Sequence, residues 1–189
     1  MSLRQRQLLT PEEYLAIERR SKTRNEYYRG EVFAFAGASR RHNRIVTNLV
    51  TALDTQLRAR PCNVYSSDMR VKISAAGIYA YPDVVVTCGT ELFEDEIKDT
   101  LLNPLVLVEV LSESTEAYDR GTKLEHYRSI ESVRNYLLVT QDRKRVELYT
   151  FQGGADWLYK DIQPPNTDVE IASIKCSIVL ADIYYNVDT

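Results

Sequence analysis

The chain has 189 residues, of which 44% are apolar and 27% charged, so it is long enough for one well-packed core and short for two. This composition excludes a disordered protein, and we expect residues 1–189 to form a single domain. The net charge of −3 is unevenly distributed: residues 1–60 contain 12 Lys and Arg against 6 Asp and Glu, and the remaining residues contain 12 against 21. This distribution permits a basic face beside an acidic region. Chance clustering on a solvated surface explains it equally well.

The first sixty residues predict a helix, a hairpin and a second helix. Thr10-Pro11 with Glu13 forms a capping pattern, which predicts a helix to about residue 20. Residues 25–36 are typical of a β-hairpin with Arg29-Gly30 at its turn. Apolar side chains at helical spacing then predict a long amphipathic helix over residues 39–61.

The remaining sequence predicts a sheet and a further helix. The expected strands cover residues 63–73, 78–87, 104–111, 136–140, 146–151 and 157–162, with a helix over 119–130 and either a closing strand or a short helix over 178–184. Two of the strands are apolar on both faces, as in central strands covered by helices. The order predicts an α/β sandwich in which helices flank a central mixed sheet, with an N-terminal helix and hairpin added.

Glu109 interrupts the apolar stretch between residues 105 and 111. A carboxylate in a buried strand is costly unless a metal ion or a fixed cation meets it. Strand alternation puts Glu109 on the same face as Leu107 and Leu111, under one layer of helices. The alternatives are a surface glutamate at a strand end and a structural ion pair.

Asp83 stands at the head of the other central strand, directly after Pro82. If the two strands are neighbours, Asp83 and Glu109 can share one metal ion. Two hard oxygen ligands with room for water and phosphate suit Mg²⁺. A Pro-Asp pair also serves commonly as a turn or a cap.

Asp119, Lys123 and Tyr127 follow at i, i+4 and i+8, on one stripe of the helix after the Glu109 strand. A lysine delivered over that strand can orient an attacking water or neutralise charge in a phosphoryl transition state. The alternative is an exposed Asp–Lys pair of little energetic value.

Residues near the start of the long helix are candidates for substrate contacts. His42 lies among Arg41 and Arg44, where the positive end of the helix adds to their charge. We assign substrate contacts to His42, Arg41, Arg44 and Tyr127. Surface exposure without a role explains the arginines equally well.

Cys62, Cys88 and Cys176 are odd in number, far apart and form no Cys-x-x-Cys pair. This pattern argues against a disulfide framework or a zinc ribbon, so we expect core thiols in a reducing compartment. The sequence shows no secretory signal and no apolar stretch long enough to span a membrane, which predicts a cytoplasmic protein without a membrane partner. No phosphate-binding glycine loop, dinucleotide fingerprint or serine elbow is present.

Several motifs together resemble the PD-(D/E)XK superfamily and, within it, the Uma2 family. The matching stretches are Leu9-Thr10-Pro11-Glu12-Glu13-Tyr14, Tyr28-Arg29-Gly30-Glu31-Val32, His42, Tyr81-Pro82-Asp83-Val84, Val108-Glu109-Val110-Leu111-Ser112, Asp119 with Lys123 and Tyr127, and Tyr136-Leu137-Leu138-Val139. This resemblance covers nearly the whole chain and implies a restriction-endonuclease-like fold.

The resemblance also implies a site and an activity. Asp83 and Glu109 would bind Mg²⁺, or Mn²⁺ in its place, with Glu31 as an additional carboxylate, and the reaction would be phosphodiester hydrolysis. The superfamily places a lysine two residues after the glutamate, where this chain has Leu111, so Lys123 is the candidate replacement. Restriction-like folds often pair, and by analogy we expect a homodimer acting on nucleic acid, with DNA as the expected substrate.

We therefore predict a Mg²⁺-dependent endonuclease with Asp83, Glu109, Lys123 and Glu31 as its catalytic residues. A catalytically inactive nucleic-acid-binding or scaffolding module of the same fold is one alternative, which the missing cation at Leu111 favours. Hydrolysis of a small phosphorylated substrate is another, because the chain as a whole is acidic.

Overall fold

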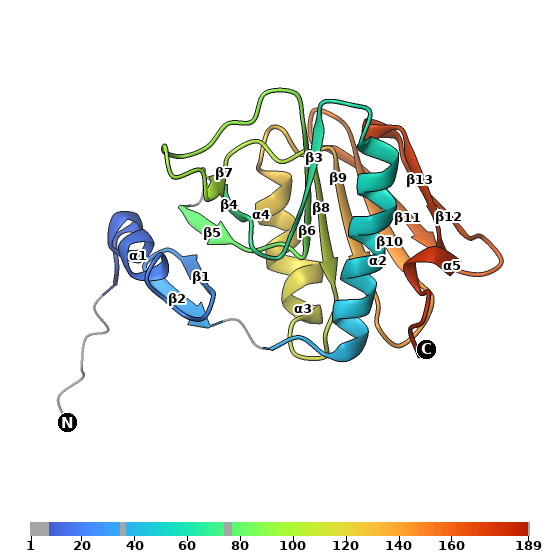
Figure 1. Cartoon of the computed structure of the whole chain (residues 1–189), viewed down its shortest axis with the longest axis horizontal. Helices are drawn as coiled ribbons and strands as arrows, with labels where there is room; N and C mark the ends of the chain where they lie inside the picture. The colour runs from blue at the N-terminus through green and yellow to red at the C-terminus, as the bar shows by residue number, and fades with distance from the viewer. Residues whose placement is uncertain (1–7, 35–36, 74–76, 189) are drawn as a thin grey trace.

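A computed structural model describes residues 8–34, 37–73 and 77–188. In this part of the chain, a six-stranded mixed sheet has helices on both faces, and a five-stranded sheet and a two-stranded sheet lie beside it (Figure 1). The predicted α/β sandwich with its N-terminal helix and hairpin is confirmed. No helix in the described ranges has the length and apolar character needed to cross a bilayer.

The helical elements are α1 (Pro11–Glu18), α2 (Arg40–Leu57), α3 (Glu116–Tyr118), the π-helical turn η2 (Asp119–Lys123), α4 (Leu124–Arg128), the 3₁₀ turn η3 (Ala172–Ile174) and α5 (Leu180–Ile183). The strands are β1 (Asn25–Tyr28), β2 (Glu31–Ala34), β3 (Cys62–Ser66), β4 (Arg70–Ile73), β5 (Ile78–Ala80), β6 (Val84–Cys88), β7 (Thr100–Leu101), β8 (Val106–Val110), β9 (Asn135–Val139), β10 (Val146–Gly153), β11 (Asp156–Ile162), β12 (Asp168–Ile171) and β13 (Cys176–Val179).

Helix α1 begins where the capping pattern predicts. The Thr10 hydroxyl accepts the Glu13 N–H (3.2 Å), and the Glu13 carboxylate accepts the Thr10 N–H (2.8 Å). These two bonds satisfy groups that the first helical turn leaves unpaired. The helix ends at Glu18, two residues before the predicted end.

The predicted hairpin is formed by β1 and β2, which pair with Tyr28 opposite Glu31. Its turn residues Arg29 and Gly30 both have positive φ angles, 46° and 98°, as a tight hairpin turn requires. Strand β1 also pairs with β5, which makes the hairpin the outer part of the five-stranded sheet, in the order β2-β1-β5-β4-β7. Residues 35 and 36, the predicted end of the hairpin, lie outside the described residues.

The six-stranded sheet has the order β11-β10-β9-β8-β6-β3. Helix α2, capped by Ser39, covers one face, and α4 covers the other (Figure 1). Valines 84, 86, 106 and 108 pack toward α2, whereas Val85 and Leu107 pack toward α4. The central strands β6 and β8 are thus apolar on both sides because each side meets a helix.

Two of the predicted strands are wrong in extent, because each is two strands in different sheets. The segment over residues 63–73 divides at a turn into β3 and β4, and the segment over 78–87 divides into β5 and β6. Pro82 lies at the second division, where it lacks the N–H that a continuing ladder needs. Asp83 therefore sits where the chain passes from one sheet to the other.

The helix after β8 also differs from its prediction. Helical structure starts at Glu116, includes the π-helical turn η2 and ends at Arg128, whereas the sequence predicts one helix over residues 119–130. At the C-terminus both predicted alternatives occur, since β13 is followed directly by α5. Strand β12, which pairs with β13, was not predicted.

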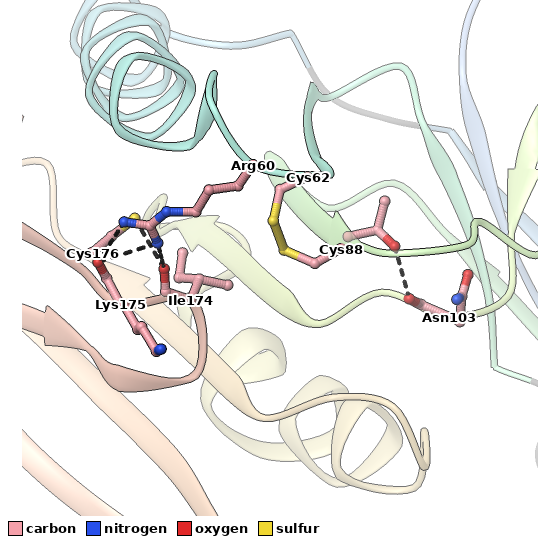
Figure 2. The surroundings of a disulfide bond; sticks show 8 residues. Arg60, Cys62, Cys88, Asn103, Ile174, Lys175 and Cys176 are labelled. Atoms are coloured by element: carbon pink, nitrogen blue, oxygen red, sulfur yellow. Dashed lines mark hydrogen bonds between the residues drawn. A yellow bond between two sulfur atoms is a disulfide. The ribbon is translucent and has the colours of Figure 1, made fainter.

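The expectation of three free thiols is wrong for two of the cysteines. Cys62 and Cys88 face each other in the β3–β6 ladder, with their Cα atoms 4.0 Å apart, and form a disulfide (Figure 2). The pairing follows from strand register, which spacing along the chain does not reveal. Cys176 is a free, buried thiol, as expected.

Candidate active site

Asp83 and Glu109 come together at one end of the β6–β8 pair. Val84 lies opposite Val108 in this antiparallel ladder, so Asp83, which directly precedes β6, and Glu109, near the end of β8, lie at the same end of the pair. The Val110 N–H donates to Asp83 Oδ2 (2.7 Å), which ties this carboxylate to β8. Glu109 contacts Tyr127 of α4, Asp83 contacts His42 of α2, and the negative charge of Asp83 contributes to the raised pKa of Glu109.

The two oxygens of Asp83 have different surroundings. Oδ2 also lies 3.0 Å from Nε2 of His42, which comes from the first turn of α2. Oδ1 is buried and, among the described residues, has no hydrogen-bond partner. An unpartnered buried carboxylate oxygen is costly. A cation at this position would satisfy it.

Glu109 is buried in β8 and is held by two donors. The Tyr127 hydroxyl donates to Oε1 (2.8 Å), and the Lys123 ammonium lies 2.9 Å from the same oxygen. Burial raises the pKa of Glu109 well above its ordinary value, Lys123 opposes that shift, and Asp83 adds to it. The alternative of a surface glutamate is thereby removed, because Glu109 is only 3% exposed.

Lys123 stands at the end of the π-helical turn η2, a local distortion that is frequent at functional sites. Its ammonium lies 2.9 Å from Glu109, 3.2 Å from Glu26 and 3.6 Å from Asp119. Burial alone would lower the pKa of Lys123, but these three carboxylates raise it well above its ordinary value. The pair with Asp119 is buried, which removes the alternative of an exposed Asp–Lys pair.

Glu26 is a site residue that sequence reasoning missed. It lies on β1, and besides Lys123 its carboxylate accepts the N–H of Tyr81 (3.2 Å). The sequence predicted Glu31 from the same hairpin, and the structure puts Glu31 in the wall of the same cavity. The hairpin was visible in the sequence, but the pairing of β1 with β5, which brings Glu26 over the site, was not.

A second ion-pair cluster holds η2 in place. Arg120, in the middle of this turn, forms ion pairs with Glu116 on α3 and with the buried Glu147 on β10. Arg145 lies 3.3 Å from the same carboxylate of Glu147. Because Arg120 and Lys123 belong to one helical turn, the ion pair with Glu147 fixes the segment that delivers Lys123.

These residues line an open cavity of about 1310 Å³ between the two larger sheets and the first turn of α2. Two of the four residues predicted to contact substrate, Arg41 and His42, line this cavity. Arg44 is directed to the C-terminal segment, where it donates to the Tyr185 carbonyl (3.3 Å). Tyr127 is fully buried and contacts Glu109.

The donor set bears on which metal could bind. No group of three or more His, Cys, Asp or Glu side chains in the described ranges is arranged to hold an ion by itself. The two carboxylates of Asp83 and Glu109 beside an open cavity leave room for water and substrate oxygens. This incomplete, all-oxygen set fits Mg²⁺, which usually binds through one or two carboxylates together with water and phosphate. It does not fit a closed zinc site.

Comparisons with known proteins identify the family and the fold of the chain. Residues 11–180 match the model of the Uma2 family, described as "Putative restriction endonuclease". Two uncharacterized proteins of Synechocystis sp., sll1609 and slr1290, are each 35% identical to this chain; the matches cover 89% and 93% of this chain and 95% and 91% of theirs. The crystal structure of "a putative nuclease belonging to DUF820" from Anabaena variabilis has the same fold, with a TM-score of 0.76 at 17% identity over 93% of this chain and 97% of that one.

Proposed function

The chain belongs to the Uma2 family, and we propose that it is a metal-dependent endonuclease that hydrolyses phosphodiester bonds in DNA. One observation carries the proposal: Asp83 and Glu109 lie at one end of the β6–β8 pair, where the Val110 N–H donates to Asp83 and the Lys123 ammonium lies 2.9 Å from Glu109. The family description supports a nuclease. The metal is inferred from the chemistry of the site, and DNA as the substrate is inferred from the family description.

The metal would be held by Asp83 and Glu109. When bound, Mg²⁺ or Mn²⁺ supplies Lewis acidity and lowers the pKa of a coordinated water. The buried Oδ1 of Asp83, which lacks a donor among the described residues, is the oxygen most available to it. His42 and the Val110 N–H hold the other oxygen and so fix the orientation of this carboxylate.

Lys123 supplies the fixed positive charge of the site. Its ammonium has three protons to donate, and in the resting site they face Glu26, Glu109 and Asp119. A phosphoryl group entering the cavity would exchange one of these contacts for its own oxygen. The ammonium then stabilises the negative charge that develops in the transition state.

The position of Lys123 favours an enzyme over an inactive module of the same fold. The main argument against catalysis is that this chain has Leu111 where the superfamily has a lysine. Lys123 brings an ammonium to the same glutamate from the adjacent helix, within 2.9 Å. The cation that this chemistry needs is therefore supplied from another element.

A cleavage assay tests the proposal. Single-stranded and plasmid DNA are incubated with the protein and Mg²⁺ or Mn²⁺, beside Asp83→Ala and the matched control Asp156→Ala, which changes an exposed aspartate outside the cavity. We expect cleavage by the unaltered protein and by Asp156→Ala, and none by Asp83→Ala. Cleavage that survives Asp83→Ala refutes this site. Binding without cleavage supports the inactive module, and turnover of small phosphate esters alone supports the metabolite hydrolase.

A further inference from the structure

Aromatic rings line the same cavity as the carboxylates. Tyr28 and Phe33 come from the β1–β2 hairpin and Tyr118 from α3. Phe33 is 51% exposed and Tyr118 is 38% exposed, although most large apolar side chains of the described residues are buried. Exposed rings inside a cavity gain burial when a ligand covers them.

The hairpin register points Phe33 toward the reactive groups. Phe33 lies opposite Glu26 in the β1–β2 ladder, so their side chains share one face, and Glu26 contacts Lys123 (3.2 Å). Tyr118 adjoins the same ammonium, whose Nζ lies 6.0 Å from its ring centroid. Tyr28 already packs against His126, with ring centroids 5.4 Å apart. Phe33 and Tyr118 are therefore the rings available to a ligand.

The reactive groups themselves are recessed. Asp83, Glu109 and Lys123 are each no more than 4% exposed, so a phosphodiester has to enter the cavity to reach them. In a duplex, the face of each base is covered by its neighbours, and a base must leave the stack before a protein ring can cover it. An unpaired strand meets both requirements, because it bends into the cavity and offers free base faces.

We propose that the cavity binds an unpaired nucleotide strand, with bases stacked on Phe33 and Tyr118 and a backbone phosphate beside Lys123. This assignment rests on the proposed nuclease function and narrows its substrate class. Arg41 and Arg143, both exposed side chains of the cavity wall, supply positive charge for the neighbouring phosphates. Stacking on aromatic side chains tolerates any base, so binding depends little on sequence.

Fluorescence anisotropy tests the assignment without requiring cleavage. The probes are a labelled oligothymidylate, a labelled DNA hairpin duplex and a labelled oligouridylate, each titrated with protein in Ca²⁺ and checked on a gel for intactness. The first two compare unpaired with paired strands, and the third separates RNA from DNA as the source of the strand. The variants are Phe33→Ala, Phe33→Leu, Tyr118→Ala and, as matched control, Tyr159→Ala on β11, an exposed aromatic outside the cavity.

We expect a single-stranded probe to bind at least roughly ten-fold more tightly than the duplex. Phe33→Ala, Phe33→Leu and Tyr118→Ala should each weaken that binding by roughly ten-fold, because one stacked base is lost. Tyr159→Ala should leave it unchanged. Thermal melting of each variant establishes that it is folded, and Phe33→Leu keeps the apolar volume while it removes the ring.

Equal affinity for duplex and single strands, unchanged affinity in the Phe33 and Tyr118 variants, or no binding of any probe would each overturn the assignment. These outcomes are separable from failure of the nuclease proposal, which is measured by cleavage. A protein that cuts duplex and single strands equally well refutes only the proposal that the cavity prefers an unpaired strand. A protein that binds single strands through Phe33 and Tyr118 without cutting them refutes only the proposed nuclease activity.

Discussion

Replacing Lys123 by Met removes the cation at the centre of the site and keeps an unbranched apolar stem of similar length. Lys123 is 4% exposed, and its ammonium lies within 3.6 Å of the carboxylates of Glu26, Glu109 and Asp119. Removing it leaves the buried Glu109 and Asp119 and the partly buried Glu26 without a compensating cation. Breaking a buried ion pair in this way typically costs about 3–5 kcal/mol.

The expected loss of stability is large because Lys123 is buried, whereas an ion pair of a surface lysine contributes little to the free energy of unfolding. For a chain of this size, about 3–5 kcal/mol corresponds to a fall in Tm of roughly 6–20 °C. The matched control is Lys144→Met, an exposed lysine, for which we expect a change within about 0.5 kcal/mol. Both variants should remain folded at room temperature, since domains have about 5–15 kcal/mol of stability.

Urea unfolding in EDTA, followed by circular dichroism, measures the free energy of unfolding of each variant. A loss below about 1 kcal/mol for Lys123→Met, indistinguishable from Lys144→Met, would refute the view that the ammonium balances this carboxylate cluster. Repeating the experiment with Mg²⁺ extends the test. A divalent ion at 100 times its Kd that binds only the folded state adds about 2.7 kcal/mol, so the free energy of unfolding of the variant should rise by about that amount over its value in EDTA.

Asp99→Asn should destabilise the protein by about 1–2 kcal/mol at neutral pH, because Asp99 forms ion pairs with Arg19 and the buried Arg70, both at 2.9 Å. The arginines hold the pKa of Asp99 well below its ordinary value, so its contribution to stability is present above pH ~4 and is lost as the pH falls further. In acid unfolding, the difference in stability between Asp99→Asn and the unaltered protein should therefore shrink to zero as the pH falls. Tyr127→Phe removes only the hydroxyl that donates to Glu109; we expect the cleavage rate to fall about ten-fold with little change in Tm, and an unchanged rate would remove Tyr127 from the site. The homodimer stays a prediction, and light scattering at micromolar concentration decides it: a monomeric mass would contradict the analogy.

Features that depend on local chemistry were predictable from the sequence. Thr10 caps α1 as predicted, because its hydroxyl accepts a bond from the first turn of that helix. Asp83 and Glu109 could be named as candidates because a carboxylate at or inside an apolar strand needs a positive partner. Lys123 was identifiable by its helical spacing, which holds even across the π-helical turn.

Features that depend on strand pairing were not predictable. Glu26 reaches Lys123 only because β1 pairs with β5, which belongs to a sheet formed from segments far apart in the chain. The disulfide of Cys62 and Cys88 requires that these residues face each other across β3 and β6. Residues 78–88 form two strands in different sheets, β5 and β6, with Asp83 between them. This break arises from tertiary packing, and the alternation of apolar and polar residues along the sequence does not reveal it.

Asp83 and Glu109, at one end of the β6–β8 pair, are proposed to hold a divalent cation beside Lys123. Calorimetric titration with Mn²⁺ tests this claim most directly, using the unaltered protein, Asp83→Asn and Glu109→Gln, all checked for folding by thermal melting. We predict saturable binding by the unaltered protein that is lost in both variants, since each removes one anionic ligand and keeps its shape. Equal Mn²⁺ binding by all three proteins would contradict the claim.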